Sequence, residues 1–379
     1  MYDKVKNYAE RKGSGYRVLS ARFPAACVFL LTIHLCLAGS GLAEEGAPNP
    51  TPRGVVEAKP AKSELLVEAT TDIPEVEELI TKFMNLNPDV SVQYSKIASG
   101  RLFDNVAKPS EARGQADVVW SSAMDLQIKL ANDGYAAEYR SSEISHVPDW
   151  AQWKDRAYGV TAEPVVIIFN KRLLRGNLVP RDHADLLRVL TDYRSVFAGK
   201  IATYDPEQSG TGLLFITQDL RVTAQTWKLV AAMGRAGVKL YSTSGAMIDR
   251  VSAGDLVLAY NVLGSYALER AKNEPDLGIV FPNDYTLLLS RIVLVPEAAR
   301  QRALAKRFID FLLSYDGQAL LARHSLGSVR DDMKQAIPGF ADAKEALRPI
   351  ALSIDLLTYL DQSKRKRFLK DWKDALQER

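Results

Sequence analysis

The segment Ser209-Gly210-Thr211-Gly212 alternates hydroxyl side chains with glycines and opens a predicted helix. Glycine lets the backbone approach a ligand closely, and the first N–H groups of a helix attract anions. We therefore predict that Ser209, Gly210 and Thr211 bind an oxyanion without covalent chemistry. An ordinary helix cap would use the same residue types, but Asp205-Pro206 begins a turn longer than a minimal cap needs. No Gly-Lys-Ser/Thr follows, so the segment is not a phosphate-binding P-loop.

Similar polar residues follow three predicted strands in the first half of the chain. In open α/β sheets, ligands bind beyond the carboxyl ends of strands. The candidates are Thr70 and Thr71 after the strand at 65–69, Ser99 and Gly100 after the strand at 90–94, and Ser121 and Ser122 after the strand at 117–120. Helix capping explains each pair as well as ligand contact does.

The second half of the chain adds candidates of mixed chemistry. They are Thr161, Glu163, Ser244, Asn261, Ser265 and Tyr266. Glu163 could face a cation or brace a connection between lobes, Ser244 could be a helix cap, and Tyr266 could flank a sugar or an organic acid. Arg291 could clamp an anion or pair with a carboxylate across the lobes. Because Ser, Thr and Gly outnumber acidic residues at these positions, we expect a small anionic solute, phosphorylated or carboxylated.

Motifs for catalysis and metal binding are missing from the sequence. It contains no Gly-x-Ser-x-Gly and no His-Glu-x-x-His. His146, His183 and His324 are too scattered for a metal-ligand spacing. Both cysteines, Cys27 and Cys36, lie near the N-terminus. We predict no enzyme, no metal and no cofactor, although a Ser/Lys or paired-carboxylate site stays open.

Short apolar runs alternate with amphipathic helices, which is typical of parallel α/β units. About 315 residues after the N-terminal segments suit two lobes. We predict an α/β clamp with two crossover segments forming a hinge. The first lobe would comprise residues 64–164 and 285–379, and the second residues 165–284. The basic run at 364–367 is expected to be a solvated helix face, with a membrane or permease contact as the alternative.

The N-terminus reads as an export signal. Six Lys/Arg precede the apolar run 23–37, and Gly41-Leu42-Ala43 fits a cleavage site, so we expect residues 1–43 to be a signal peptide. Residues 44–63 are rich in Pro, Gly and Ala and are expected to be a disordered linker. Removing 1–43 leaves 43 of 49 basic and 44 of 46 acidic residues. A periplasmic location follows, with no nucleic-acid partner.

The order of several motifs resembles extracellular solute-binding proteins of ABC transporters, the ferric-iron-binding-like group of the type 2 periplasmic binding fold. The motifs are Thr70-Thr71-Asp72, Asn87-Pro88, Asp117-Val118-Val119-Trp120, residues 159–170, residues 205–212 and Ser314-x-x-Gly317-Gln318. The resemblance covers about residues 65–325. It implies a monomeric two-lobed protein that hands a small-molecule solute to an inner-membrane ABC permease.

One departure from that group concerns iron. Its iron binders use an adjacent Tyr-Tyr pair, whereas the corresponding segment here has Gly264-Ser265-Tyr266 and the chain contains no Tyr-Tyr. Ferric iron therefore becomes an alternative to the anionic solute. A second alternative keeps the fold but makes the protein a sensing subunit that contacts a membrane histidine kinase of a two-component system.

Overall fold

The structure is a computed structural model that describes residues 62–109, 115–333 and 344–378. The predicted signal peptide and residues 44–61 of the predicted linker lie outside the described residues. The last linker position was assigned wrongly, because strand β1 (Ser63–Ala69) already begins at Ser63. The N–H groups of Lys62 and Ser63 both donate to the carbonyl of Asp89, which fixes this strand start beside the next strand.

The first sheet has six strands in the order β2-β1-β3-β12-β5-β4. Their bounds are β1 (Ser63–Ala69), β2 (Val90–Lys96), β3 (Val118–Ser121), β4 (Gln152–Trp153), β5 (Ala157–Gly159) and β12 (Ile292–Leu294). β1 pairs with β2 and β3 in parallel, so the carboxyl ends of these three strands meet at one edge. β12 joins antiparallel to β3 and β5. The predicted strand-end residues of the first half therefore share this edge.

The second sheet has the order β13-β11-β6-β9-β7-β8, with β10 also paired to β6. Its strands are β6 (Glu163–Asn170), β7 (Ile201–Tyr204), β8 (Lys239–Tyr241), β9 (Leu258–Leu263), β10 (Leu277–Val280), β11 (Thr286–Leu289) and β13 (Leu347–Pro349). The uninterrupted apolar sequence of β6 is buried along almost its whole length, as expected for a central strand covered on both faces.

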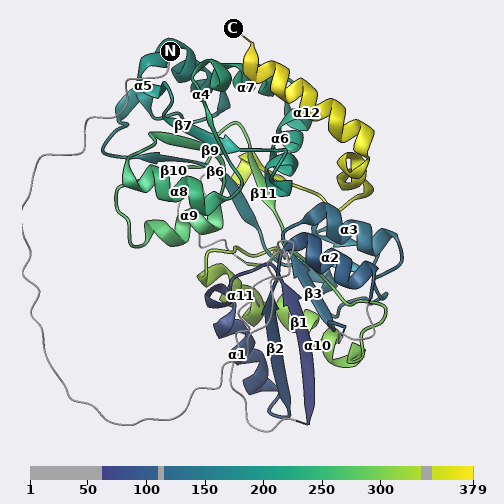
Figure 1. The fold of residues 1–379 in the computed structure, drawn as a ribbon. Helices are drawn as coiled ribbons and strands as arrows, with labels where there is room; N and C mark the ends of the chain where they lie inside the picture. Colours follow the sequence, from purple (N-terminus) through teal and green to yellow (C-terminus); the bar gives the residue numbers. More distant parts are fainter. Residues whose placement is uncertain (1–61, 110–114, 334–343, 379) are drawn as a thin grey trace, which may run out of the picture. The chain divides into compact units, whose positions relative to one another are not determined.

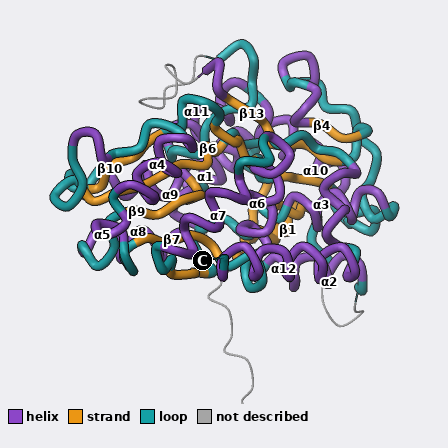
Figure 2. Tube along the Cα trace, turned by 90° about the horizontal axis from the view of Figure 1, so that it is seen from above, coloured by secondary structure: helices purple, strands orange, loops and turns teal. Residues whose placement is uncertain are grey.

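Helices flank both sheets (Figures 1 and 2). Those beside the first sheet are α1 (Glu77–Leu86), α2 (Ser99–Ala107), α3 (Met124–Asn132), α10 (Arg302–Leu313) and α11 (Tyr315–Arg323). Those beside the second are α4 (His183–Asp192), α5 (Arg194–Phe197), α6 (Gly210–Val222), α7 (Thr226–Arg235), α8 (Ser244–Ala253), α9 (Gly264–Ala271) and α12 (Gln362–Gln377). The apolar face of α1, with Leu79, Ile80 and Phe83, is buried in the core of the first sheet.

Among the described residues, two segments run directly between the two lobes, by which we mean the two sheets with their helices, and a third contacts both. The run from β5 to β6 and the run from β11 to β12 lie side by side, because the N–H of Val160 donates to the carbonyl of Arg291. The two predicted crossovers are these segments. A third segment follows β13, where the N–H of Ile350 donates to Leu288 and that of Leu352 donates to Trp150.

The C-terminal part of the domain assignment was wrong in part: β12, α10 and α11 lie with the first sheet, as predicted, but other elements do not. Residues 285–379 were assigned to the first lobe, yet β11 and β13 belong to the second sheet and α12 packs along α7 (Figure 1). Phe368 and Trp372 of α12 are buried in the core beneath that sheet, next to Trp227. The apolar spacing of α12 predicts that one face is buried, but it does not reveal which helix covers that face.

Within the described residues, no helix combines the length and the apolarity that a membrane span requires.

Candidate functional site

A buried ion pair joins the two crossover segments. Glu163 begins β6 and Arg291 immediately precedes β12; their side chains are 0% and 1% exposed. The guanidinium donates from Nε to Oε1 at 2.8 Å and from Nη2 to Oε2 at 3.0 Å. Two parallel charge-assisted hydrogen bonds fix both partners in orientation. Of the two predicted alternatives for Arg291, the structure therefore shows the carboxylate pairing.

Three other predicted site residues form hydrogen bonds to this ion pair. Thr161 donates its hydroxyl to Oε1 of Glu163 at 2.8 Å and accepts the N–H of Arg291 at 2.8 Å. Ser265 donates to Oε2 of Glu163 at 2.5 Å, and Thr71 accepts from Nη1 of Arg291 at 3.0 Å. A buried pair is tolerated when its remaining polar valences are satisfied. The cluster draws on β1, the crossovers and α9, and so connects both lobes.

Close packing of α9 on β6 allows Ser265 to reach Glu163. A Cβ added to Gly264, the first residue of α9, would lie 2.6 Å from the carbonyl oxygen of Pro164. Only glycine allows this approach. It brings Ser265 onto Glu163 and sets the Tyr266 ring 5.7 Å from the guanidinium carbon of Arg291. The glycine thus positions two predicted site residues.

Glu75 belongs to the same cluster and is missing from the sequence prediction. It ends the short helix Ile73–Glu75 after β1, and its Oε2 lies 4.0 Å from Nη2 of Arg291. That oxygen is buried without a hydrogen-bond partner among the described residues. Burial raises the pKa of Glu75 to about 7, opposed by Arg291 and reinforced by Glu163 and Asp72. A single glutamate in a helical turn belongs to no sequence motif that would predict its place in this cluster.

The polar residues at the edge of the first sheet lie together. The hydroxyls of Thr70 and Ser122 are 3.5 Å apart, and the Ser122 N–H donates to the Thr70 hydroxyl at 3.1 Å. Ser121 accepts the N–H of Ala123. Ser99 and Gly100 form the first turn of α2. Helices α2 and α9 begin without a side-chain cap. In the first turn of α3, the N–H of Leu126 donates to the carboxylate of Asp125 at 2.9 Å.

The structure places Ser209 and its neighbours apart from the Arg291 cluster. The Ser209 hydroxyl accepts the N–H of Gly212 at 3.1 Å, which is the helix-cap alternative. Gly210 lines a separate cavity of about 210 Å³ between α3, α6 and the turn Ile354–Leu360, and Thr211 follows it in the first turn of α6. No predicted residue besides Gly210 is among those lining it.

Ser244 and Asn261 also have structural partners. The Ser244 hydroxyl accepts the N–H of Leu263 at 3.0 Å and bonds the hydroxyl of Tyr204. Asn261, with φ of 60°, donates its side-chain amide to Asp219 at 2.6 Å. Both residues stabilise the second lobe's interior around the start of α9.

Asp219 is the centre of a second buried polar group. It is 0% exposed and accepts hydrogen bonds from Tyr260 at 2.8 Å, Tyr285 at 3.1 Å and Asn261. Burial raises the pKa of Asp219, while nearby His183 lowers it. The His183 ring stacks on Tyr285 with centroids 4.0 Å apart. Three donors satisfy this carboxylate, so the group has a structural explanation.

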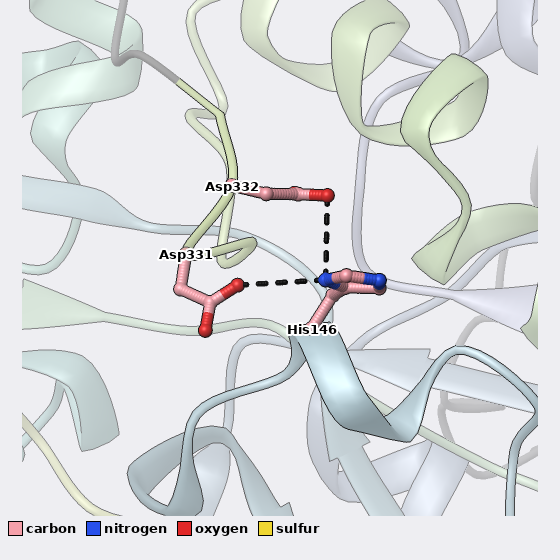
Figure 3. Close-up of side chains that lie close together, drawn as sticks. All are labelled: His146, Asp331 and Asp332. Carbon is pink, nitrogen blue, oxygen red and sulfur yellow. Dashed lines mark ion pairs between the residues drawn. The ribbon is translucent and has the colours of Figure 1, made fainter.

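A surface cluster combines His146 with Asp331 and Asp332 (Figure 3). The His146 Nδ1 lies 3.7 Å from an oxygen of Asp331 and 3.3 Å from one of Asp332. Both oxygens of Asp332 accept hydrogen bonds from Arg330 at 2.8 Å. Arg330 therefore pairs with Asp332, and the arrangement is that of a surface ion-pair network.

Comparisons of the sequence and of the structure with known proteins both find similarity to solute-binding proteins. Residues 78–348 match the sequence profile of the bacterial extracellular solute-binding proteins. The substrate-binding protein of an ABC transporter from Agrobacterium tumefaciens is 38% identical, with a TM-score of 0.77 over 87% of this chain and 100% of that one. A search of curated proteins found no match.

Two more distant structures share the fold. The periplasmic binding protein AfuA from Actinobacillus pleuropneumoniae, with fructose-6-phosphate bound, is 21% identical, with a TM-score of 0.65 over 83% of this chain and 99% of that one. Iron-bound HitA from Pseudomonas aeruginosa is 19% identical, with a TM-score of 0.65 and the same coverage.

Proposed function

The chain belongs to the family of bacterial extracellular solute-binding proteins, and from this premise we propose that it captures a small anionic solute in the periplasm for an ABC-type importer. The observation that carries the proposal is the similarity, over 87% of this chain, to a transporter's substrate-binding protein, together with a polar cluster that joins residues of both lobes. In such a protein, two lobes close on a solute held between them.

The anion would be held by hydroxyls and backbone N–H groups and not by Arg291. Glu163 already neutralises that guanidinium with two hydrogen bonds. At the edge of the first sheet, Thr70, Ser99 and Ser122 accompany the uncapped start of α2. The N-termini of helices carry partial positive charge and free donors, so they suit phosphate or carboxylate oxygens.

A solute-binding protein acts together with partners and does not need to convert its solute chemically. We propose an inner-membrane ABC permease as the partner and a monomer as the working form, without contact to nucleic acid. Export would proceed through the N-terminal signal peptide expected at residues 1–43. The polar cluster is engaged in hydrogen bonds within the chain, and we propose that it positions the solute and does not transform it.

Ferric iron is the other candidate, because iron-bound HitA has the same fold. Phenolate oxygens suit Fe³⁺, but two tyrosines near the Glu163–Arg291 cluster already make hydrogen bonds to other groups of the protein. Tyr94 donates to the carbonyl of Thr71 at 2.8 Å, and the Tyr204 hydroxyl bonds Ser244. This leaves Tyr266 with Glu75, a smaller set of oxygen donors than a tyrosine pair with a carboxylate would provide. The anionic solute is therefore preferred.

The test is a thermal-unfolding screen of the mature protein with inorganic phosphate, fructose 6-phosphate, citrate and ferric citrate. A bound solute at 100 times its Kd stabilises the fold by about 2.7 kcal/mol. We expect a metal-free phosphorylated or carboxylated compound to raise the midpoint, and Ser122→Ala to reduce the rise. Ser314→Ala, which removes the cap of α11, should lower the midpoint of the solute-free protein but leave the solute-induced rise unchanged. Stabilisation by ferric citrate alone would contradict the proposal.

A further inference from the structure

Glu75, whose side chain is 16% exposed, differs in one respect from the fully buried Glu163 and Asp219, a respect that it shares with Oε2 of Glu274. Glu163 has four hydrogen-bond donors around its two oxygens, and Asp219 has three. The Oε2 atom of Glu75 is buried with none, and Nη2 of Arg291 stands 4.0 Å away, beyond hydrogen-bonding distance. A buried carboxylate oxygen without a donor costs free energy unless a further group supplies one.

The charges that face Glu75 do not supply that donor. Arg291 is already paired with Glu163, and Lys96 is paired with Asp72 at the start of the same short helix. Tyr266 and Tyr94 are the neutral titratable groups nearby, and Tyr94 donates to Thr71. With Glu75 ionised, the cluster of Arg291, Glu163 and Glu75 carries one uncompensated negative charge. A donor brought by the solute would satisfy it.

We infer that Glu75 is a solute-contacting, specificity-determining residue whose free carboxylate oxygen accepts a hydrogen bond from an ammonium or hydroxyl group of the captured solute. The inference rests on the proposed function and deepens it. The solute then combines two features, an acidic group for the uncapped start of α2 and a donor for Glu75. An amino acid, an aminophosphonate or a sugar phosphate satisfies both; sulfate, which carries no hydrogen-bond donor at neutral pH, satisfies only the first.

The raised pKa of Glu75 adds a pH dependence. Since the ionised carboxylate is the better acceptor for a donor, capture should strengthen as pH rises through about 7. The charged groups that face Glu75 are Arg291, Glu163, Asp72 and Lys96. Glu75→Gln keeps the size of the side chain and removes its titration.

The experiment uses ligand-free mature protein, prepared by unfolding, dialysis and refolding. It is dialysed against a small-molecule extract of bacterial cells, and the retained compounds are measured by mass spectrometry at pH 6 and pH 8. Three proteins are compared, namely the wild type, Glu75→Gln, and Glu77→Gln as a matched control on the exposed first turn of α1. Circular dichroism confirms that each refolds.

We expect the wild type and Glu77→Gln to retain an acidic compound with an amine or hydroxyl group, more strongly at pH 8 than at pH 6. Glu75→Gln should retain at least tenfold less of it, with a weaker pH dependence. Equal retention by Glu75→Gln, or a retained compound without any donor, would overturn the inference while leaving solute binding intact. No retention by the wild type would overturn the proposed function itself. A retained non-acidic compound lost in Glu75→Gln would support Glu75 and contradict the anion proposal.

Discussion

Removing one partner of the buried Glu163–Arg291 pair should strongly destabilise the protein. In Glu163→Gln, the guanidinium of Arg291 stays 1% exposed but loses the carboxylate that takes two of its N–H groups. Breaking a buried pair from one side costs about 3–5 kcal/mol, because an uncompensated charge remains in the interior. Thr71 offers only a neutral hydroxyl, and Oε2 of Glu75, 4.0 Å from Nη2, is beyond hydrogen-bonding distance, so neither replaces the two hydrogen bonds of Glu163. We expect the free energy of unfolding to fall by that amount.

The measurement is equilibrium unfolding in urea followed by tryptophan fluorescence, to which the fully buried Trp120 of β3 contributes. The double variant Glu163→Leu with Arg291→Met separates charge from packing. Replacing both partners by apolar side chains is often neutral, so it should unfold at a higher urea concentration than Glu163→Gln. Arg302→Gln is the control: its pair with Glu297 is about half exposed, and its loss should cost less than about 1 kcal/mol. A loss under about 1 kcal/mol in Glu163→Gln would refute the pairing.

Three further predictions concern stability. The fold favours the protonated form of Glu75, so the wild type loses stability as pH rises from 4.5 through about 7. In urea unfolding, Glu75→Gln should therefore gain roughly 2–3 kcal/mol over the wild type by pH 8. A difference in unfolding free energy between variant and wild type that is the same at pH 5 and pH 8 would contradict this. Gly234→Ala places a Cβ 2.1 Å from the carbonyl oxygen of Leu376 and should loosen α12, seen as faster proteolysis of the C-terminus, whereas Gly245→Ala meets nothing within 4 Å and should not. Asp219→Asn replaces an acceptor of three donors by a group that also donates, and should cost about 1–3 kcal/mol by urea unfolding; a stability equal to wild type would show that the carboxylate is not needed there.

The sequence predicts the fold better than it predicts the site. The apolar run of β6 and the alternation of strands and helices indicate the two-lobed α/β architecture, which the family similarity confirms. The site is harder, because a hydroxyl before a helix has the same pattern whether it caps the helix or binds a ligand. Ser209 turns out to cap its helix, while Ser265 reaches across to Glu163. Only the three-dimensional contacts distinguish the two.

Long-range partners account for the remaining differences. Glu75 is close in sequence to the predicted Thr71, but its distinctive feature is an unsatisfied oxygen beside Arg291, more than 200 positions away. The tail was assigned to the wrong lobe for the same reason, since the periodicity of α12 gives its buried face and not the identity of α7 as its partner. Local patterns specify elements, whereas the pairing of elements depends on the whole chain.

Native mass spectrometry of the mature protein purified from the periplasm, compared with the same sample denatured, tests solute capture most directly. We expect a reproducible mass excess that disappears on denaturation and corresponds to an organic phosphate or carboxylate. An excess of the mass of iron, or conversion of the bound compound into a different one by the purified protein, would contradict the account.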